Sequence, residues 1–180
     1  MSTNKLNPHD PRIANADPIE VVWPNFVAWC NKVTTNLGRP GLLVAWNGLS
    51  CDVKWMFKLT SPSGKWKLKM PEGVQFFCDP CSAIKHYKSC KLNGTKTGRN
   101  HALGTIYEFI TGNQLLDAHN SLIDAKAQLL VFHHQYFRKF LDTGKTIQLM
   151  ENALQSKMRK QIKQDNELTK PVPLGWEEDS

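Results

Sequence analysis

The chain has 180 residues, 41% of them hydrophobic and 22% charged, and a formal net charge of +7. This composition predicts one globular unit with a hydrophobic core and excludes a chain that is disordered throughout. No apolar run of about 18 residues is present, which argues against a membrane-spanning helix. The polar N-terminus lacks a secretory signal, so we expect an intracellular protein, cytoplasmic or nuclear and not secreted.

The first elements in chain order are an arm, a helix, a strand and a short helix. Residues 1–17 are polar and rich in proline, which predicts an unstructured arm. Residues 19–37 carry apolar side chains at helical spacing and are followed by glycine, a common helix stop. Residues 41–47 form an apolar run closed by Asn-Gly, which predicts a buried strand, and residues 52–59 predict the short helix.

Further along, the pattern predicts one more strand and mainly helices. The expected elements are a turn-rich excursion over 61–73, a strand over 74–78, a helix over 82–90, a loop over 91–100, a helix over 101–110, a long helix over 118–141, and a basic amphipathic helix over 145–163. The long helix carries an apolar stripe along one side, so we expect it to pack against the core.

His119 and Asp124 stand five residues apart at the start of the long helix. At about 3.6 residues per turn the two side chains fall within roughly 140° of each other, so both can reach one cleft. This arrangement permits a general base beside a metal ligand, as in metal-dependent nucleases. Such pairs also occur as solvated or locally hydrogen-bonded residues. Asp52, which follows the strand over 41–47, is a second candidate ligand.

Two motifs resemble those of a known enzyme family. Residues 46–52, Trp-Asn-Gly-Leu-Ser-Cys-Asp, and residues 119–124, from histidine to aspartate, resemble the second and third motifs of the DEDD-type 3′ to 5′ exonucleases. The match is to the histidine subgroup of these enzymes, within the ribonuclease H-like superfamily. Trp46 and Cys51 depart from the usual His and Phe. The resemblance spans roughly residues 19–141 and implies an α/β fold with a parallel strand pair and packed helices.

The family's first motif, an Asp-x-Glu on the central strand, has no counterpart on a predicted strand. Its literal match, residues 165–167, lies in a polar segment where a solvated helix end is expected. The resemblance therefore implies an incomplete domain that lacks the N-terminal antiparallel strands. The expected organisation is an arm over 1–17, an exonuclease-like region over 18–142, a basic amphipathic helix within 143–168 and a flexible tail over 169–180.

The resemblance also implies roles for individual residues. Asp124 would bind the first of two Mg²⁺ or Mn²⁺ ions directly, Asp52 would support the second through water, and His119 would deprotonate the attacking water. Two carboxylates are too few ligands for two metal ions, because Mg²⁺ prefers near-octahedral oxygen coordination. We therefore expect weak metal binding and impaired hydrolysis of DNA or RNA 3′ ends, unless another chain completes the sheet and the site.

The sequence pI near 9.2 indicates a polyanionic partner. Two cationic runs could contact phosphates, although solvated surface is the alternative for both. The first run, residues 65–69, alternates cations with apolar residues as a strand or ribbon would. The predicted nucleic-acid contacts are Asn47, Lys65, Trp66, Lys67 and Lys69, and the second run consists of Lys85, Lys88, Lys91, Lys96 and Arg99. A non-catalytic nucleic-acid-binding or scaffold module is the alternative to the enzyme.

Five cysteines without an export signal indicate reduced thiols. Cys78, Cys81, His86 and Cys90 have the spacing C-x2-C-x4-H-x3-C, one residue short of a zinc knuckle that binds single-stranded nucleic acid. The segment lacks the glycines of such knuckles. The alternative is that these cysteines are small buried apolar residues.

Overall fold

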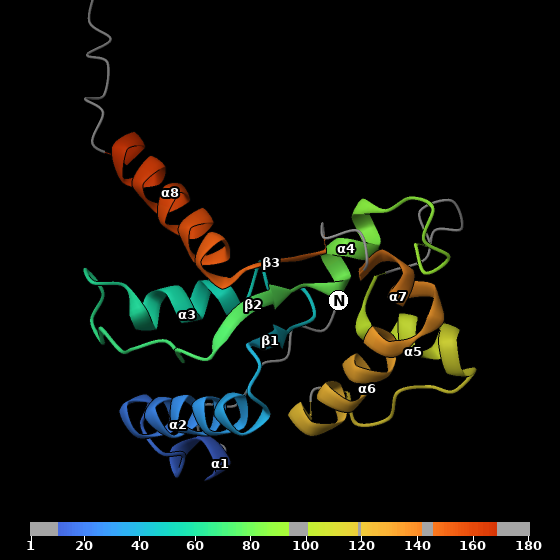
Figure 1. Ribbon diagram of the computed structural model, residues 1–180, viewed down its shortest axis with the longest axis horizontal. Coiled ribbons are helices and arrows are strands. Elements are labelled where there is room, and N and C mark those ends of the chain that lie inside the picture. The colour runs from blue at the N-terminus through green and yellow to red at the C-terminus, as the bar shows by residue number, and fades with distance from the viewer. Residues whose placement is uncertain (1–10, 94–100, 119, 142–145, 169–180) are drawn as a thin grey trace, which may run out of the picture. The chain divides into compact units, whose positions relative to one another are not determined.

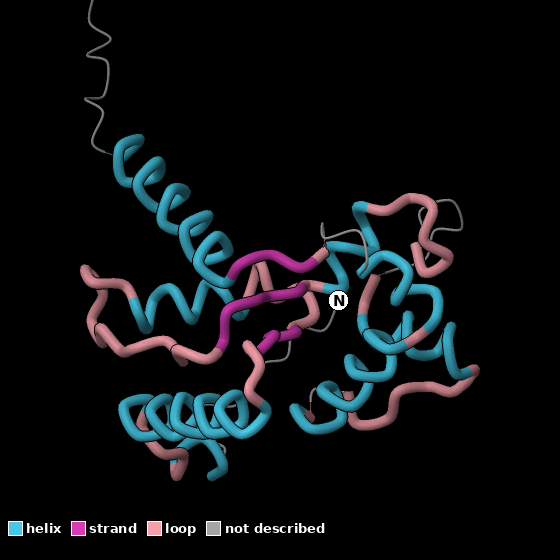
Figure 2. Tube along the Cα trace, viewed as in Figure 1, coloured by secondary structure: helices cyan, strands magenta, loops and turns pink. Residues whose placement is uncertain are grey.

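The computed structural model describes residues 11–93, 101–118, 120–141 and 146–168, without the side chains of residues 12, 13 and 160–168. The structure is mixed α/β, as the sequence predicts (Figures 1 and 2). The chain divides into two compact units. One is formed from the described residues within 1–41 and 58–74, and the other from the described residues within 42–57 and 75–180.

The first unit is built on α2, which spans Ile19–Leu37 and confirms the predicted helix. The helix ends at Gly38, whose φ of 59° lies in the left-handed region that glycine adopts without strain. Before it, α1 (Pro11–Ala14) forms one helical turn inside the segment predicted to be an unstructured arm. Residues 1–10 of that arm lie outside the described part of the chain.

The turn-rich segment over 61–73 packs against one side of α2. The indole Nε1 of Trp23 donates to the carbonyl of Lys69 at 2.8 Å, and the N–H of Gly73 donates to the side chain of Asn31 at 3.2 Å. Trp23 is buried, but much of the helix's apolar stripe stays exposed to solvent. The exposed residues of α2 include Val22, Trp29, Val33 and Leu37. The helical spacing therefore predicted the helix correctly without identifying its buried side.

A three-stranded sheet, in the order β1-β2-β3, is formed by β1 (Gly41–Val44), β2 (Val74–Cys78) and β3 (Ile147–Leu149) (Figure 1). Strand β2 pairs with β3 antiparallel, with Phe77 opposite Gln148. The sheet is mixed, so β1 runs parallel to β2, as expected for the predicted pair. β3 is a correction to the sequence analysis, which predicted helix over 145–163.

Helices of the second unit carry most of its core. They are α3 (Asp52–Thr60), which begins in this unit, α4 (Pro80–His86), α5 (Leu103–Thr111), α6 (Ser121–His133), α7 (Gln135–Leu141) and α8 (Met150–Leu168). The core cluster consists of Cys78, Ala83, Ile84, Cys90, Leu92, Ile106, Val131, Phe137 and Phe140. It joins β2, α4, α5, α6 and α7 and the turn after α4. The literal Asp-x-Glu at 165–167 lies near the end of α8.

The predicted long helix over 118–141 is wrong as one continuous element, because it breaks at His134. This residue has an extended backbone with ψ of 140°, and its N–H donates to the carbonyl of Val131. Its imidazole Nδ1 then accepts from the N–H of Tyr136 at 3.2 Å, at the start of α7. The side chain thus satisfies a backbone donor that the helix start leaves unpaired. The bend allows Phe137 to be fully buried.

Replacing either of two glycines with alanine should change the stability of the fold in opposite directions. A Cβ at Gly48 would lie 2.5 Å from the Cβ of Ala45 and 2.8 Å from Cζ of Phe77, so Gly48→Ala should destabilise the fold by about 1–3 kcal/mol through overpacking. A Cβ at Gly104, in α5, would come no closer than 3.9 Å to Leu115. Gly104→Ala should therefore stabilise by up to about 1 kcal/mol. Urea unfolding monitored by circular dichroism measures both, and equal effects would contradict the packing at Gly48.

Candidate functional site

The candidate site lies where β1 and β2 end. Because the two strands are parallel, their carboxyl ends lie at the same edge of the sheet. The N–H of Ala45 donates to the carbonyl of Cys78 at 3.1 Å and extends the pairing beyond β1. The chain then turns at Asn47, whose φ of 56° is in the left-handed region that asparagine tolerates. This turn leads to Asp52, and β2 leads directly to Asp79.

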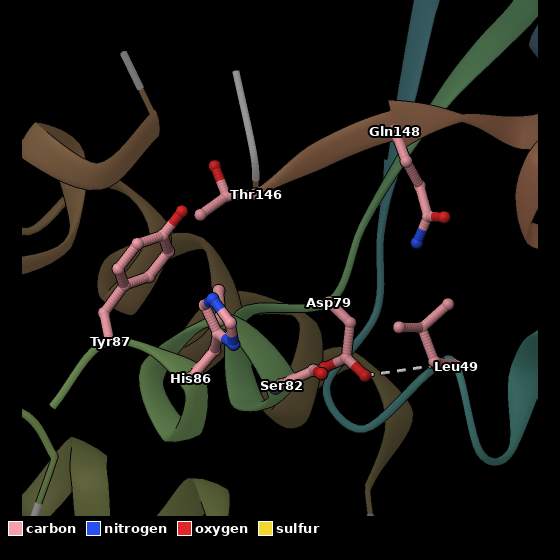
Figure 3. A pocket seen from close by; sticks show the side chains of 8 residues that line it. Leu49, Asp79, Ser82, His86, Tyr87, Thr146 and Gln148 are labelled. Carbon is pink, nitrogen blue, oxygen red and sulfur yellow. Dashed lines mark hydrogen bonds between the residues drawn. The ribbon is translucent and has the colours of Figure 1, made fainter. Parts of the chain in front are cut away.

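Asp79 holds this edge of the sheet together. Its side chain is 4% exposed. Oδ1 accepts from the N–H of Asn47 at 2.9 Å and from the N–H of Ser82 at 3.2 Å. Oδ2 accepts from the N–H of Leu49 at 3.2 Å (Figure 3). The same carboxylate therefore caps α4, with Pro80 in the first turn, and fixes the turn after β1.

The sequence analysis predicted the strand over 74–78 but did not include Asp79, the residue that follows it, among the site residues. The signal was present, because aspartate followed by proline is a common start of a helix. What the sequence did not indicate is that the carboxylate also binds the turn 30 residues earlier. Since its oxygens already accept three backbone N–H groups, Asp79 is a structural clamp and not a free metal ligand.

Asp52 is the first residue of α3, where a negative charge is favoured by the helix dipole. Asp52 is an exposed residue, but partial desolvation of its carboxyl raises the pKa; a hydrogen bond from the backbone lowers it, and the charge of Asp79 raises it further. The two aspartates therefore interact electrostatically at the end of the sheet.

Asp124 lies half-buried in the first turn of α6. The N-cap of the helix is Asn120, whose side chain accepts from the N–H of Leu122 at 3.1 Å. One turn after Asp124, the Oε1 of Gln128 accepts from the N–H of Trp46 at 3.0 Å. Residues four apart share one side of a helix, so this bond holds the side of α6 that bears Asp124 against the end of β1. His119 lies outside the described residues.

The donor chemistry of Asp52 and Asp124 suits Mg²⁺ or Mn²⁺, since both supply carboxylate oxygens. Among the side chains that the structure describes, no three His, Cys, Asp or Glu groups are placed to hold a metal ion. These residues therefore do not fit a two-metal centre by themselves.

The four residues of the zinc-knuckle pattern do not gather into one site. Burial raises the pKa of Cys78 to about 12 and also raises the pKa values of Cys81 and Cys90. The thiol of Cys81 donates to the carbonyl of His101 at 3.6 Å, and that of Cys90 donates to a carbonyl of α7 at 3.5 Å. These are neutral, buried thiols, which agrees with the apolar alternative.

Residues 65–69 form a loop of the first unit, as the predicted turn-rich excursion over 61–73 implies, and not the strand or ribbon that their alternation indicated. Lys67 has a φ of 50°, which interrupts an extended backbone. Trp66 turns toward α2, where its indole Nε1 donates to Glu20 at 3.0 Å, and Lys65 Nζ lies 5.2 Å from the centre of its ring. Lys65, Lys67 and Lys69 are all exposed, so they stay candidate phosphate contacts.

Two pockets adjoin the clamp. One, with a volume of about 230 Å³, is lined by Leu49, Asp79, Ser82, Ala83, His86, Tyr87, Thr146 and Gln148 (Figure 3). The other, of about 420 Å³, is lined by Trp46, Asn47, Cys81, Lys85, His101 and Ala102. The second pocket is lined by Asn47, a predicted nucleic-acid contact, and by Lys85 of the second cationic run.

A scan of protein-family models gives no match to this chain, and a search of the curated proteins gives none either. Among the helices described, none is both long enough and apolar enough to cross a bilayer.

The raised pKa of Asp52 predicts a pH dependence of stability. An acid whose pKa is higher in the folded state binds its proton more tightly there, so its contribution to stability falls as the pH rises through the folded pKa. The wild type should therefore gain stability relative to Asp52→Asn as the pH falls from neutral through the titration of Asp52. Urea unfolding of both proteins across this range measures the difference. A difference that is independent of pH, or a loss of relative stability in acid, would contradict the environment described for Asp52.

Proposed function

We propose that this chain carries part of a DEDD-type 3′ to 5′ exonuclease domain of the ribonuclease H-like class, acting on or binding DNA or RNA. The single observation that carries the proposal is the hydrogen bond between Trp46 and Gln128. It ties the side of α6 that bears Asp124 to the end of β1, and the turn from this strand leads to Asp52. The motif over 46–52 is thus in direct contact with the helix that carries Asp124 of the other motif.

The proposal gives Asp52 and Asp124 the role of metal-binding carboxylates. Two divalent ions in such a centre activate water and stabilise the leaving oxygen of a phosphodiester. Because the described residues do not complete that centre, further carboxylates must come from another chain or segment. This chain alone should bind Mg²⁺ or Mn²⁺ weakly and hydrolyse nucleic acid negligibly. His119 is proposed as the general base on the sequence motif alone.

A non-catalytic nucleic-acid-binding module is the second candidate function. The observation in its favour is the exposure of Lys65, Lys67 and Lys69 in a loop that does not depend on a metal centre. Loss of binding on replacing these lysines, with no effect of Asp52 or Asp124, would support this alternative.

The enzyme proposal predicts a specific effect of Asp124→Asn on metal binding. Mn²⁺ titrations followed by electron paramagnetic resonance should detect weak binding in the wild type. Removing one anionic ligand should weaken Mn²⁺ binding at least about tenfold in Asp124→Asn. Asp52→Asn should also weaken Mn²⁺ binding. An assay with a 3′-labelled single-stranded oligonucleotide should show binding without appreciable shortening.

Asp117→Asn is the matched control, because Asp117 is exposed, precedes α6 and has no place in the proposed centre. Its φ of 54° is one that asparagine also tolerates. Equal Mn²⁺ binding by the wild type, Asp124→Asn and Asp117→Asn would remove the basis for a metal-dependent activity. Stepwise 3′ shortening that is lost in His119→Ala would instead show that the chain is a complete enzyme.

A further inference from the structure

The pocket of about 420 Å³ at the end of β1 has the size of a small-ligand site, for which about 300–1,000 Å³ is usual. Its lining combines an aromatic ring, an amide, a cation, an imidazole and a thiol, all from the second unit. It shares no lining residue with the pocket that contains Asp79. The two pockets are therefore distinct.

Trp46 gives this pocket a rigid aromatic wall. Its indole Nε1 donates to the carbonyl of His101 at 3.0 Å, and its backbone N–H donates to Gln128 at 3.0 Å. The side chain is half-buried and packs partly against the core cluster. A ring fixed in this way loses little conformational entropy when a planar ligand stacks on it. Nucleobases unstacked from their neighbours bind aromatic side chains in this manner.

Asn47 supplies polar recognition beside that ring. It is exposed, and its Nδ2 lies 3.9 Å from the Sγ of Cys51, a weak interaction that a better acceptor can replace. An asparagine amide offers both donors and an acceptor, which is the combination that pairs with the edge of a base. The left-handed backbone of Asn47 is held by Asp79, through the N–H of Asn47 itself.

Lys85 supplies positive charge at the same pocket. Residues 80–93 contain three lysines, at positions 85, 88 and 91, and no Asp or Glu. All three lysines are exposed. Cys81 lines the same pocket, and burial raises the pKa of its thiol although the charge of Lys85 lowers it. Because the thiol stays neutral, it does not cancel the charge of Lys85, which suits a phosphate.

We propose that this pocket binds one nucleotide of single-stranded nucleic acid, with the base stacked on Trp46 and bonded to Asn47 and a neighbouring phosphate at Lys85. The inference rests on the proposed function, which it deepens by specifying the form of the substrate. A paired base is not accessible to such a pocket, because its edge and faces are occupied within the duplex. The protein should therefore prefer single strands.

The test measures the binding of fluorescent single-stranded DNA to the full chain by anisotropy. One oligonucleotide carries all its bases, and a second of equal length and charge consists of abasic residues. The wild type should prefer the first at least about tenfold, as expected for one stacked base. Asn47→Gly should lower this preference severalfold without abolishing it, since the amide is lost, the stack on Trp46 remains, and glycine accepts the φ of 56°.

Charge variants provide the matched control. Lys85→Gln should weaken binding of the oligonucleotide with bases about tenfold, whereas Lys32→Gln, which removes an exposed charge from α2, should change it less than about twofold. Equal binding of both oligonucleotides by the wild type, or equal effects of the two lysine variants, would overturn the pocket but leave nucleic-acid binding in place. Absence of binding to either oligonucleotide would overturn both this inference and the nucleic-acid function.

Discussion

The carboxylate of Asp79 is the interaction on which this region of the structure depends. One nearly buried side chain accepts N–H groups from the turn after β1 and from the start of α4. Hydrogen bonds to a charged acceptor contribute about 1.5–3 kcal/mol each, more than neutral ones. The turn from Asn47 to Asp52 has backbone hydrogen bonds of its own, from the N–H groups of Ser50 and Cys51 to the carbonyl of Asn47. Asp79 adds the bonds that fix Asn47 and Leu49 to a residue that follows a different strand.

This constraint connects the two proposed activities of the second unit. In the proposed metal centre, the charge of Asp79 raises the pKa of Asp52, and Gln128 bonds the helix that bears Asp124 to Trp46. In the proposed nucleotide pocket, Trp46, Asn47 and Lys85 form part of the lining. Both proposals therefore depend on the same turn. Neither arrangement requires the lysine loop of the first unit, which contacts α2 separately.

Sequence patterns within a segment predicted the helices and strands that do not depend on distant contacts. The helix over 19–37, which ends at a glycine, and the strand over 74–78 have their predicted bounds. The missed features depend on distant contacts: β3 exists because it pairs with β2, and the break at His134 allows Phe137 to reach the core. The same holds for the site. Asn47 and Asp52 were proposed as site residues from their motif, whereas the clamp by Asp79 required knowing which strands are adjacent.

The central claim is that Asp79 fixes the turn after β1, and amide hydrogen exchange measured by nuclear magnetic resonance tests it most directly. The N–H groups of Asn47 and Leu49 lie outside the strands, so protection of both should come from this carboxylate. We expect slow exchange in the wild type and in Ser82→Ala, whose hydroxyl takes no part in the clamp. In Asp79→Asn the opening free energy of both amides should fall by about 1–3 kcal/mol. Rapid exchange in the wild type, or unchanged protection in Asp79→Asn, would contradict the account.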